Sequence, residues 1–233
     1  MSRNPILVAI DTIDAARADA LIAAAGPHVG GIKLGLEYFC ARGPEATAKA
    51  AAGHFLFLDL KLHDIPNTVA SAVRAVAPLA PDLLTIHASG GAAMMKAARD
   101  AAEESAAGGK RTKLIGVTVL TSLDDADLEA IGQRGATRDQ ALRLAALAQA
   151  NGLDGVVCSP REVAALRAEC GPDFVLVVPG IRPAGSDLGD QKRVMGPAEA
   201  VAAGATHLVI GRPITAAPDP AAAARTIAAA LGH

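Results

Sequence analysis

Charged side chains interrupt one apolar segment of the chain. In FLDLKLHDIPNT, residues 57–68, every second residue of the first part is leucine, with Asp59 and Lys61 between the leucines and Asp64 two residues further on. Successive side chains of a strand point to opposite faces, so Asp59 and Lys61 would share one face, roughly 7 Å apart at about 3.3 Å per residue. The pattern predicts a buried strand that carries a carboxylate and an ammonium group side by side.

An ammonium group next to carboxylates is suited to acid catalysis. Opposite charges nearby keep the Lys61 side chain protonated. A protonated lysine is a poor nucleophile, which argues against Schiff-base catalysis, since that reaction needs a neutral amine. Lys61 could instead deliver a proton to a carbanion, while Asp59 disfavours any anionic group that a substrate places beside it. The pair therefore suits a reaction that protonates carbon.

The elements that must position these groups alternate along the chain, because short β-branched runs alternate with long Ala-rich segments. This rhythm is typical of βα units. Helix-compatible stretches follow each expected strand, from 14–25 after the first to 221–231 after the last. The expected strands cover residues 6–11, 29–35, 55–62, 83–88, 113–120, 155–159, 174–180 and 207–211.

Eight βα units in 233 residues match a (β/α)₈ barrel, which is typically about 250 residues long. An open doubly wound sheet is the alternative, but it would favour a Gly-rich dinucleotide turn after the first strand. Residues 11–16 read DTIDAA instead. We therefore predict an α/β fold, a single (β/α)₈ TIM barrel domain over residues 1–233.

A barrel would bring the charged residues to one place, because the carboxyl ends of all its strands face the same mouth. Each residue alone could be an ion-pair partner or a helix cap. Several charges buried merely as filler would be more costly than Leu or Val. We therefore expect an active site formed by five charged residues, namely Asp11, Lys33, Asp59, Lys61 and Asp64.

A second kind of site is predicted at VIGRPITAAPDP, where the eighth strand ends at Gly211 and Arg212. The loops after strands seven and eight of barrels often bind phosphate, and Arg212 can add a two-pronged contact. The irregular segment 180–197 contains Arg182 and Gln191. Long polar loops are often ligand loops, although a solvated surface loop remains the alternative. These residues predict a phosphate site.

Composition excludes several other functions. The formal net charge of −2 and the pI near 6.3 predict no polyanion-binding surface and hence no nucleic acid partner. Charges or turn residues interrupt every run of about 18 residues, so we expect no membrane span, and MSRNPILVAID lacks a signal peptide's apolar region. The 3 cysteines are widely spaced, which argues against disulfides or a CxxC metal site. We expect a cytoplasmic protein.

Eight motifs share their order and approximate spacing with one enzyme family. They are VAID (8–11), GIKLG (31–35), DLKLHDIPNT (59–68), HASGG (87–91), VTVLTS (117–122), PGIRP (179–183), DQKR (190–193) and VIGRPIT (209–215). On these motifs the chain resembles the bacterial type of the orotidine 5′-phosphate decarboxylase family. The pattern Asp-x-Lys-x-x-Asp alone also marks sister barrels that act on sugar phosphates, such as 3-keto-gulonate-6-phosphate decarboxylase and hexulose-phosphate synthase. Those relatives use a metal-binding acidic residue around strand two, where this chain has Lys33.

The resemblance implies decarboxylation of orotidine 5′-phosphate to uridine 5′-phosphate, the last step of de novo UMP synthesis, without a cofactor or a metal. It implies that Lys61 is the proton donor and that Asp59 lies beside the leaving CO₂. Lys33 and Asp64 would complete an alternating array of lysines and aspartates. It also implies a homodimer, in which one subunit reaches into its partner's site with Asp64, Ile65 and Thr68.

The resemblance also implies contacts to three parts of the substrate, namely the ribose, the pyrimidine ring and the phosphate. Asp11 and Lys33 match the pair that contacts the ribose, and Thr121 with Ser122 matches the segment that reads the pyrimidine ring. The loop 181–195 is expected to close over the phosphate. Matches to the phosphate contacts are Arg182, Gln191, Gly211 and Arg212.

One departure from the family pattern and two rival functions remain at this point. Family members often carry an acid at position 189, where this chain has Gly189, which affects only the local loop. The nearest rival is a sister aldolase or a metal-dependent sugar-phosphate decarboxylase. The other is a phosphate-binding barrel without catalytic activity, because a fold alone does not establish an activity.

Overall fold

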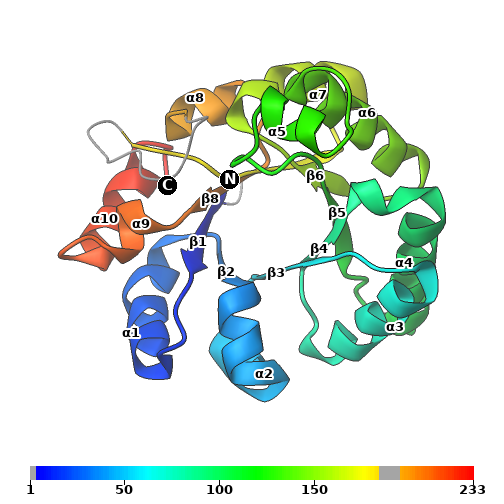
Figure 1. Cartoon of the computed structure of the whole chain (residues 1–233). Coiled ribbons are helices and arrows are strands. Elements are labelled where there is room, and N and C mark those ends of the chain that lie inside the picture. The colour runs from blue at the N-terminus through cyan, green and yellow to red at the C-terminus, as the bar shows by residue number, and fades with distance from the viewer. Residues whose placement is uncertain (1–3, 184–194) are drawn as a thin grey trace.

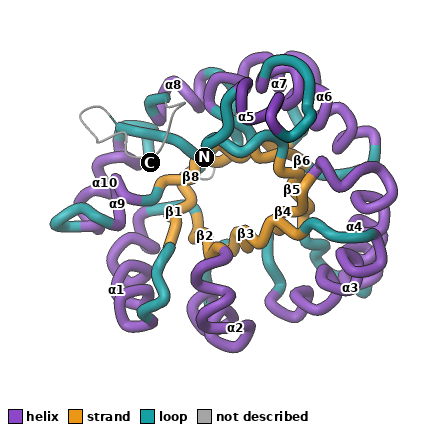
Figure 2. Tube along the Cα trace, in the orientation of Figure 1, coloured by secondary structure: helices purple, strands orange, loops and turns teal. Residues whose placement is uncertain are grey.

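Eight parallel strands form a closed barrel in the order β1 to β8 in the computed structural model, which describes residues 4–183 and 195–233. Figure 2 shows the strands as a ring with the helices outside it. The predicted (β/α)₈ fold is therefore confirmed. The strands are β1 Ile6–Ile10, β2 Gly31–Gly35, β3 Leu56–Leu62, β4 Leu83–His87, β5 Lys113–Val117, β6 Gly155–Val157, β7 Val175–Val178 and β8 His207–Ile210.

The helices lie around the outside of this ring (Figure 1). They are α1 Ala15–Ala25, α2 Leu36–Ala51, α3 Pro66–Val76, α4 Gly91–Ala106, α5 Asp125–Ala130, α6 Thr137–Ala150, α7 Val163–Cys170, α8 Pro197–Ala202, α9 Arg212–Thr215 and α10 Pro220–Ala229. Short 3₁₀ helices are η1 Gly26–His28, η2 Ala77–Leu79, η3 Ala88–Gly90 and η4 Pro160–Glu162. Within the described ranges, no helix is both long and apolar enough to cross a membrane.

Alternation along the strands divides the core into two parts. In β1, Ile6, Val8 and Ile10 point outward and pack under the helices. Leu7 points inward and packs with Phe57 and other residues from β4, β5 and β7. The strand runs are apolar on both faces because both faces are covered, as expected for a parallel barrel. Only the carboxyl ends of the strands carry the charged groups named above.

Several strands end earlier than the sequence indicates. The segment 113–120 forms a strand only to Val117, and 155–159 only to Val157. In the second case Ser159 caps η4, and its backbone N–H donates to the Glu162 side chain at 2.8 Å. A capping box satisfies the backbone there, so the chain leaves the sheet before its apolar run ends.

Side chains from neighbouring loops hold the register at the amino ends of the strands. The residue just before each of β4, β6 and β8 accepts a hydrogen bond from the first or second residue of the preceding strand. The bonds run from Leu56 to Asp82 at 2.8 Å, from Leu114 to Asp154 at 2.8 Å, and from Leu176 to Thr206 at 3.1 Å. These hydrogen bonds stabilise the amino-terminal end of the barrel, while the opposite end carries the cavity.

Candidate active site

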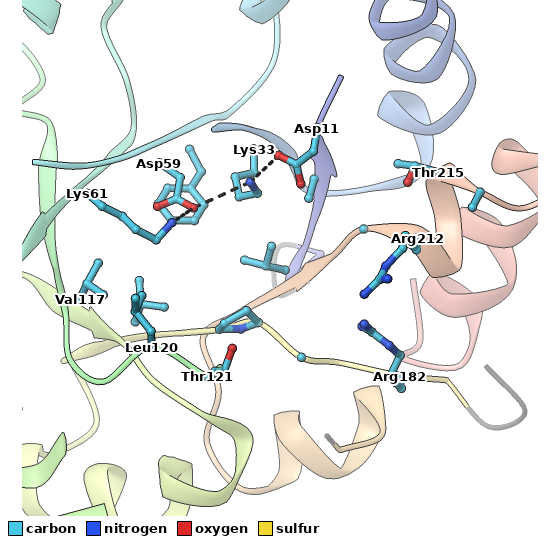
Figure 3. Close-up of a pocket in the computed structure, with 18 of the residues that line it drawn as sticks. Asp11, Lys33, Asp59, Lys61, Val117, Leu120, Thr121, Arg182, Arg212 and Thr215 are labelled. Carbon is cyan, nitrogen blue, oxygen red and sulfur yellow. Dashed lines mark hydrogen bonds and ion pairs between the residues drawn. The ribbon is translucent and has the colours of Figure 1, made fainter. Parts of the chain in front are cut away.

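A cavity of about 520 Å³ opens at the carboxyl ends of the strands. Its volume lies within the range of about 300 to 1,000 Å³ that is usual for small-molecule sites. Figure 3 shows charged side chains at two ends of this cavity. Asp11, Lys33, Asp59 and Lys61 line one end, and Arg182 and Arg212 line the other.

A continuous chain of charges crosses the first end. Lys33 Nζ lies 3.0 Å from Asp11 Oδ1 and 3.8 Å from Asp59 Oδ2. Asp59 Oδ2 in turn accepts a hydrogen bond of 2.7 Å from Lys61 Nζ. Two lysines thus alternate with two carboxylates. Among the described residues, no group of three or more His, Cys, Asp or Glu side chains is arranged to hold a metal ion.

Asp59 is the most enclosed carboxylate of this array. Burial alone would raise its pKa, but the charges of Lys33 and Lys61, with hydrogen bonds from Lys61 and Thr85, outweigh that effect and lower its pKa below the ordinary value. Asp59 is therefore ionised at neutral pH. A fixed negative charge in a buried position repels any anionic group that a ligand brings close to it.

Lys61 reaches the cavity through an irregularity in β3. Its φ of 49° lies in the left-handed region, which is uncommon for a residue with a side chain. Between Leu58 and Leu62 the pairing with β4 also shifts, because Leu58 faces Leu84 whereas Leu62 faces Ile86. Strained backbone of this kind is typical of functional sites. Asp59 and Lys61 do line one cavity as expected, but a bulge and not regular alternation brings them there.

Gly35 makes room for the array at the end of β2. A methyl group at this position would lie 3.0 Å from Lys33 Nζ and 3.2 Å from Asp11 Oδ1. Either distance would require the charged groups to move. The glycine that closes the GIKLG motif therefore permits the ion pair between Lys33 and Asp11.

Apolar side chains form the wall between the two charged ends. Val117 and Leu120 belong to it, and Thr121 adds a hydroxyl at its edge. Val209 also lines the cavity. Ser122 is exposed and is not among the described lining residues. Of the two residues expected at a pyrimidine ring, the structure thus brings only Thr121 to the cavity.

Two guanidinium groups define the other end. In Figure 3, Arg182 and Arg212 reach toward the same space. Arg182 follows β7, and Arg212 follows β8. Gly211, which precedes Arg212, also lines the cavity. Two cations aimed at one space favour an anion between them, and guanidinium groups suit phosphate oxygens. Gln191, the fourth expected phosphate contact, lies outside the described residues, as does most of the loop 181–195.

Asp64 does not join the other four charges in this chain. It is exposed, and its carboxylate accepts a hydrogen bond of 2.7 Å from the backbone of Ile65. Ile65 is 67% exposed, and Thr68 is exposed as well. Four of the five expected charges thus line the described cavity of one chain, and Asp64 is not among its lining residues. β3 ends at Leu62 and α3 begins at Pro66, so Asp64 lies in the short exposed connection between them.

The two histidines beside the array pack on each other. The rings of His63 and His87 are stacked with their centroids 5.2 Å apart. Burial, together with His63 and Lys61 nearby, lowers the pKa of His87. Neither ring is part of the described cavity wall. The stacking is in line with the expected packing role of His63, and its expected lack of a catalytic role stays a prediction.

Three residues at the site escaped the sequence analysis. Thr85 contacts Asp59 from β4, and its only signal was a polar side chain at an inward position of an apolar strand. Thr215 lines the cavity from α9, within the VIGRPIT motif. Arg17 lines it from α1. A single arginine on a predicted helix looks like a solvated side chain, so sequence carried no signal for Arg17.

Comparisons with known proteins agree on one family. The family model described as orotidine 5′-phosphate decarboxylase / HUMPS family matches residues 4–227. A relative from Paramagnetospirillum magneticum, named orotidine 5′-phosphate decarboxylase, is 60% identical over 232 residues, which cover 98% of this chain and 99% of the relative. One from Moorella thermoacetica with the same name is 53% identical over 234 residues, which cover 99% of this chain and 93% of the relative.

Solved structures show the same likeness. The structure of orotidine 5′-phosphate decarboxylase from Lactobacillus acidophilus matches with a TM-score of 0.85 and 39% identity, and covers 96% of this chain and 97% of that one. The corresponding protein from Pyrococcus horikoshii matches with a TM-score of 0.78. Its identity of 22%, over 98% of this chain and 99% of that one, supports the fold alone.

Proposed function

Because the chain belongs to the orotidine 5′-phosphate decarboxylase / HUMPS family, we infer that it converts orotidine 5′-phosphate to uridine 5′-phosphate and CO₂. It is thus a carbon-carbon lyase of pyrimidine nucleotide synthesis. The observation that carries this inference is the array of Asp11, Lys33, Asp59 and Lys61 in one cavity. A nucleotide substrate is charged and does not cross membranes, so we also propose a cytoplasmic location.

The charge of the cavity suits this substrate. Its described lining carries five cationic side chains and two carboxylates. A phosphate monoester carries about −1.5 to −2 charges at pH 7, and the carboxylate of the substrate adds one more. The excess of positive charge therefore balances a ligand with one anionic group at each end. We propose that the phosphate lies between Arg182 and Arg212 beside Gly211, and that Asp11 and Lys33 bind the ribose.

The proposed reaction takes place at the opposite end. The pyrimidine ring lies against the apolar wall near Thr121, with its carboxylate beside Asp59. Repulsion between these two anions raises the energy of the bound substrate and is relieved when neutral CO₂ leaves. The electron pair of the broken bond remains on C6, where the Lys61 ammonium stabilises it and then donates its proton. Lys61 recovers a proton from solvent after product release.

A second subunit completes the proposed site. Asp64, Ile65 and Thr68 lie beyond the cavity of their own chain and are exposed. Ile65 is 67% exposed, so its side chain is accessible to a partner. We propose a homodimer in which these three residues enter the partner's site, so that its array gains a second carboxylate next to Lys61.

The activity is tested by following the loss of orotate absorbance when purified protein is mixed with orotidine 5′-phosphate. We expect turnover at the same rate with and without EDTA, because Lys33 already provides the cation between Asp11 and Asp59. Activity that EDTA abolishes and Mg²⁺ restores would instead indicate a metal-dependent member of the family. Protein that binds uridine 5′-phosphate but never consumes the substrate would contradict the catalytic proposal.

Arg212→Ala tests the phosphate end of the site. We expect kcat/KM for orotidine 5′-phosphate to fall roughly 30- to 150-fold, because a charged contact to phosphate is lost. This corresponds to a loss of about 2 to 3 kcal/mol of transition-state stabilisation. The slow reaction of orotidine, which lacks phosphate, should change little. Arg225→Ala, which removes an exposed arginine from α10, is the matched control. Equal losses with orotidine and its phosphate would show that Arg212 does not bind this group.

A further inference from the structure

One hydroxyl group connects the two residues at the centre of the proposed reaction. Thr85 of β4 is completely buried. Its Oγ1 donates a hydrogen bond of 2.9 Å to Asp59 Oδ1 and accepts one of 2.8 Å from the backbone N–H of Lys61. A hydroxyl has one proton to donate, and here Asp59 receives it. Lys61 supplies the hydrogen bond that the same hydroxyl accepts.

We propose that Thr85 is a positioning residue for decarboxylation, whose hydroxyl holds the Asp59 carboxylate and the Lys61 main chain in the orientation that the reaction needs. This inference rests on the proposed function. Thr85 itself is not expected to touch the substrate, because it lies behind Asp59 and outside the described cavity wall.

The geometry at Asp59 supports this role. Its Oδ2 faces the lysines, at 2.7 Å from Lys61 Nζ and 3.8 Å from Lys33 Nζ. Its Oδ1 is bound by Thr85 on the other side. The carboxylate is thus held by both oxygens and cannot rotate freely. Without the hydroxyl, Oδ1 would be buried without this partner, and the carboxylate would turn to share both oxygens with the lysines.

The backbone of Lys61 gives the second argument. In the bulge of β3, the shifted pairing between Leu58 and Leu62 interrupts the regular ladder to β4. The Lys61 N–H bonds the Thr85 side chain there. This bond supports a residue with φ of 49°, which is an unfavourable conformation that the surroundings must maintain. Thr85 therefore controls both the direction of the Asp59 charge and the point from which the Lys61 side chain extends.

The experiment compares variants with and without the hydroxyl at constant size. Thr85→Val keeps the shape of threonine, and Thr85→Ser and Thr85→Ala form a second pair that differs only in the hydroxyl. We expect Thr85→Val and Thr85→Ala to lose about 10- to 100-fold in kcat, the effect of one hydrogen bond to a charged group. Exchange of the C6 proton of uridine 5′-phosphate with deuterated solvent should fall in parallel. Product affinity should stay within about threefold of wild type, and Thr85→Ser should restore most of the activity.

Thr47→Val is the matched control, because Thr47 is also completely buried and donates to a backbone carbonyl, that of Gly43, at 2.8 Å in α2. It should leave kcat unchanged. A purely structural role for Thr85 would lower thermal stability in Thr85→Val and Thr47→Val alike without the loss of kcat. The proposal is wrong if folded Thr85→Val keeps wild-type kcat, or if Thr85→Ser is as impaired as Thr85→Ala.

A crystal structure of Thr85→Val, or of Thr85→Ala if the valine variant does not fold, separates this inference from the proposed function. We expect the Asp59 carboxylate to be rotated or the Lys61 main chain to be displaced. An unchanged array would overturn the positioning role whatever the activity of the wild-type protein. If the wild-type protein failed to decarboxylate the substrate while the variant's array was displaced, the proposed function would be wrong and the positioning role would stand.

Discussion

Lys61→Ala should abolish turnover while leaving a folded protein that still binds uridine 5′-phosphate. General acid catalysis contributes about 10²- to 10⁴-fold, and electrostatic stabilisation of a developing charge about 10²- to 10³-fold. Since Lys61 is proposed to supply both, we expect kcat to fall by roughly 10⁴-fold or more. Product affinity should change little, because it depends mainly on the proposed phosphate and ribose contacts.

The decisive measurement is exchange of the C6 proton of uridine 5′-phosphate with deuterated solvent, since it runs the protonation step in reverse. Wild-type protein should catalyse it, and Lys61→Ala should not. The variant should remain folded because Lys33 still lies 3.8 Å from Asp59 and compensates part of its charge. Lys49→Ala, at an exposed lysine of α2, is the control. If folded Lys61→Ala exchanged the proton as fast as wild type, Lys61 would not be the proton donor.

Mixing two inactive variants should restore activity if the sites are shared. Asp64→Ala alone is expected to be nearly inactive, because the site that it completes in the partner loses a carboxylate. When Lys61→Ala and Asp64→Ala chains are refolded together, one site of each mixed dimer receives both defects and the other receives neither. Random pairing makes half the dimers mixed, so about a quarter of wild-type activity should return in a symmetric dimer.

A second mixture provides the control for this experiment. Lys61→Ala and Asp59→Ala remove groups that lie in the same cavity of one chain. Every site of their mixed dimers then carries one defect, so no activity should return. Recovery with the first mixture and not with the second would establish that Asp64 acts across the interface. If neither mixture recovered activity although mixed dimers formed, the shared site would be wrong.

Much of this protein could be predicted from its sequence because two of its signals are local. Strand segments are short apolar runs and helical segments are rich in alanine, so the eight βα units could be counted without coordinates. Parallel strands then place their carboxyl ends at one mouth. That rule alone brought Asp11, Lys33, Asp59 and Lys61 together, and the structure shows them in one cavity.

Other features depended on contacts between residues that are distant along the chain. Thr85 is 26 residues from Asp59, and nothing local indicates which inward residue of β4 would meet it. The left-handed conformation of Lys61 arises from a mismatch between two paired strands, whereas the alternation of leucines predicted regular pairing. Arg17 reaches the cavity from a helix on which it looks like a solvated residue.

Asp64 illustrates the same division most clearly. Sequence placed it at the end of the strand that carries Asp59 and Lys61, which was correct, and from that position alone it was expected in the same mouth. In the structure Asp64 follows β3 by two residues, is exposed and is not among the described residues that line the cavity. Residue type and periodicity thus determined the fold and the chemistry of the array. The direction of each side chain was decided by packing and hydrogen bonding between strands, which local sequence does not encode.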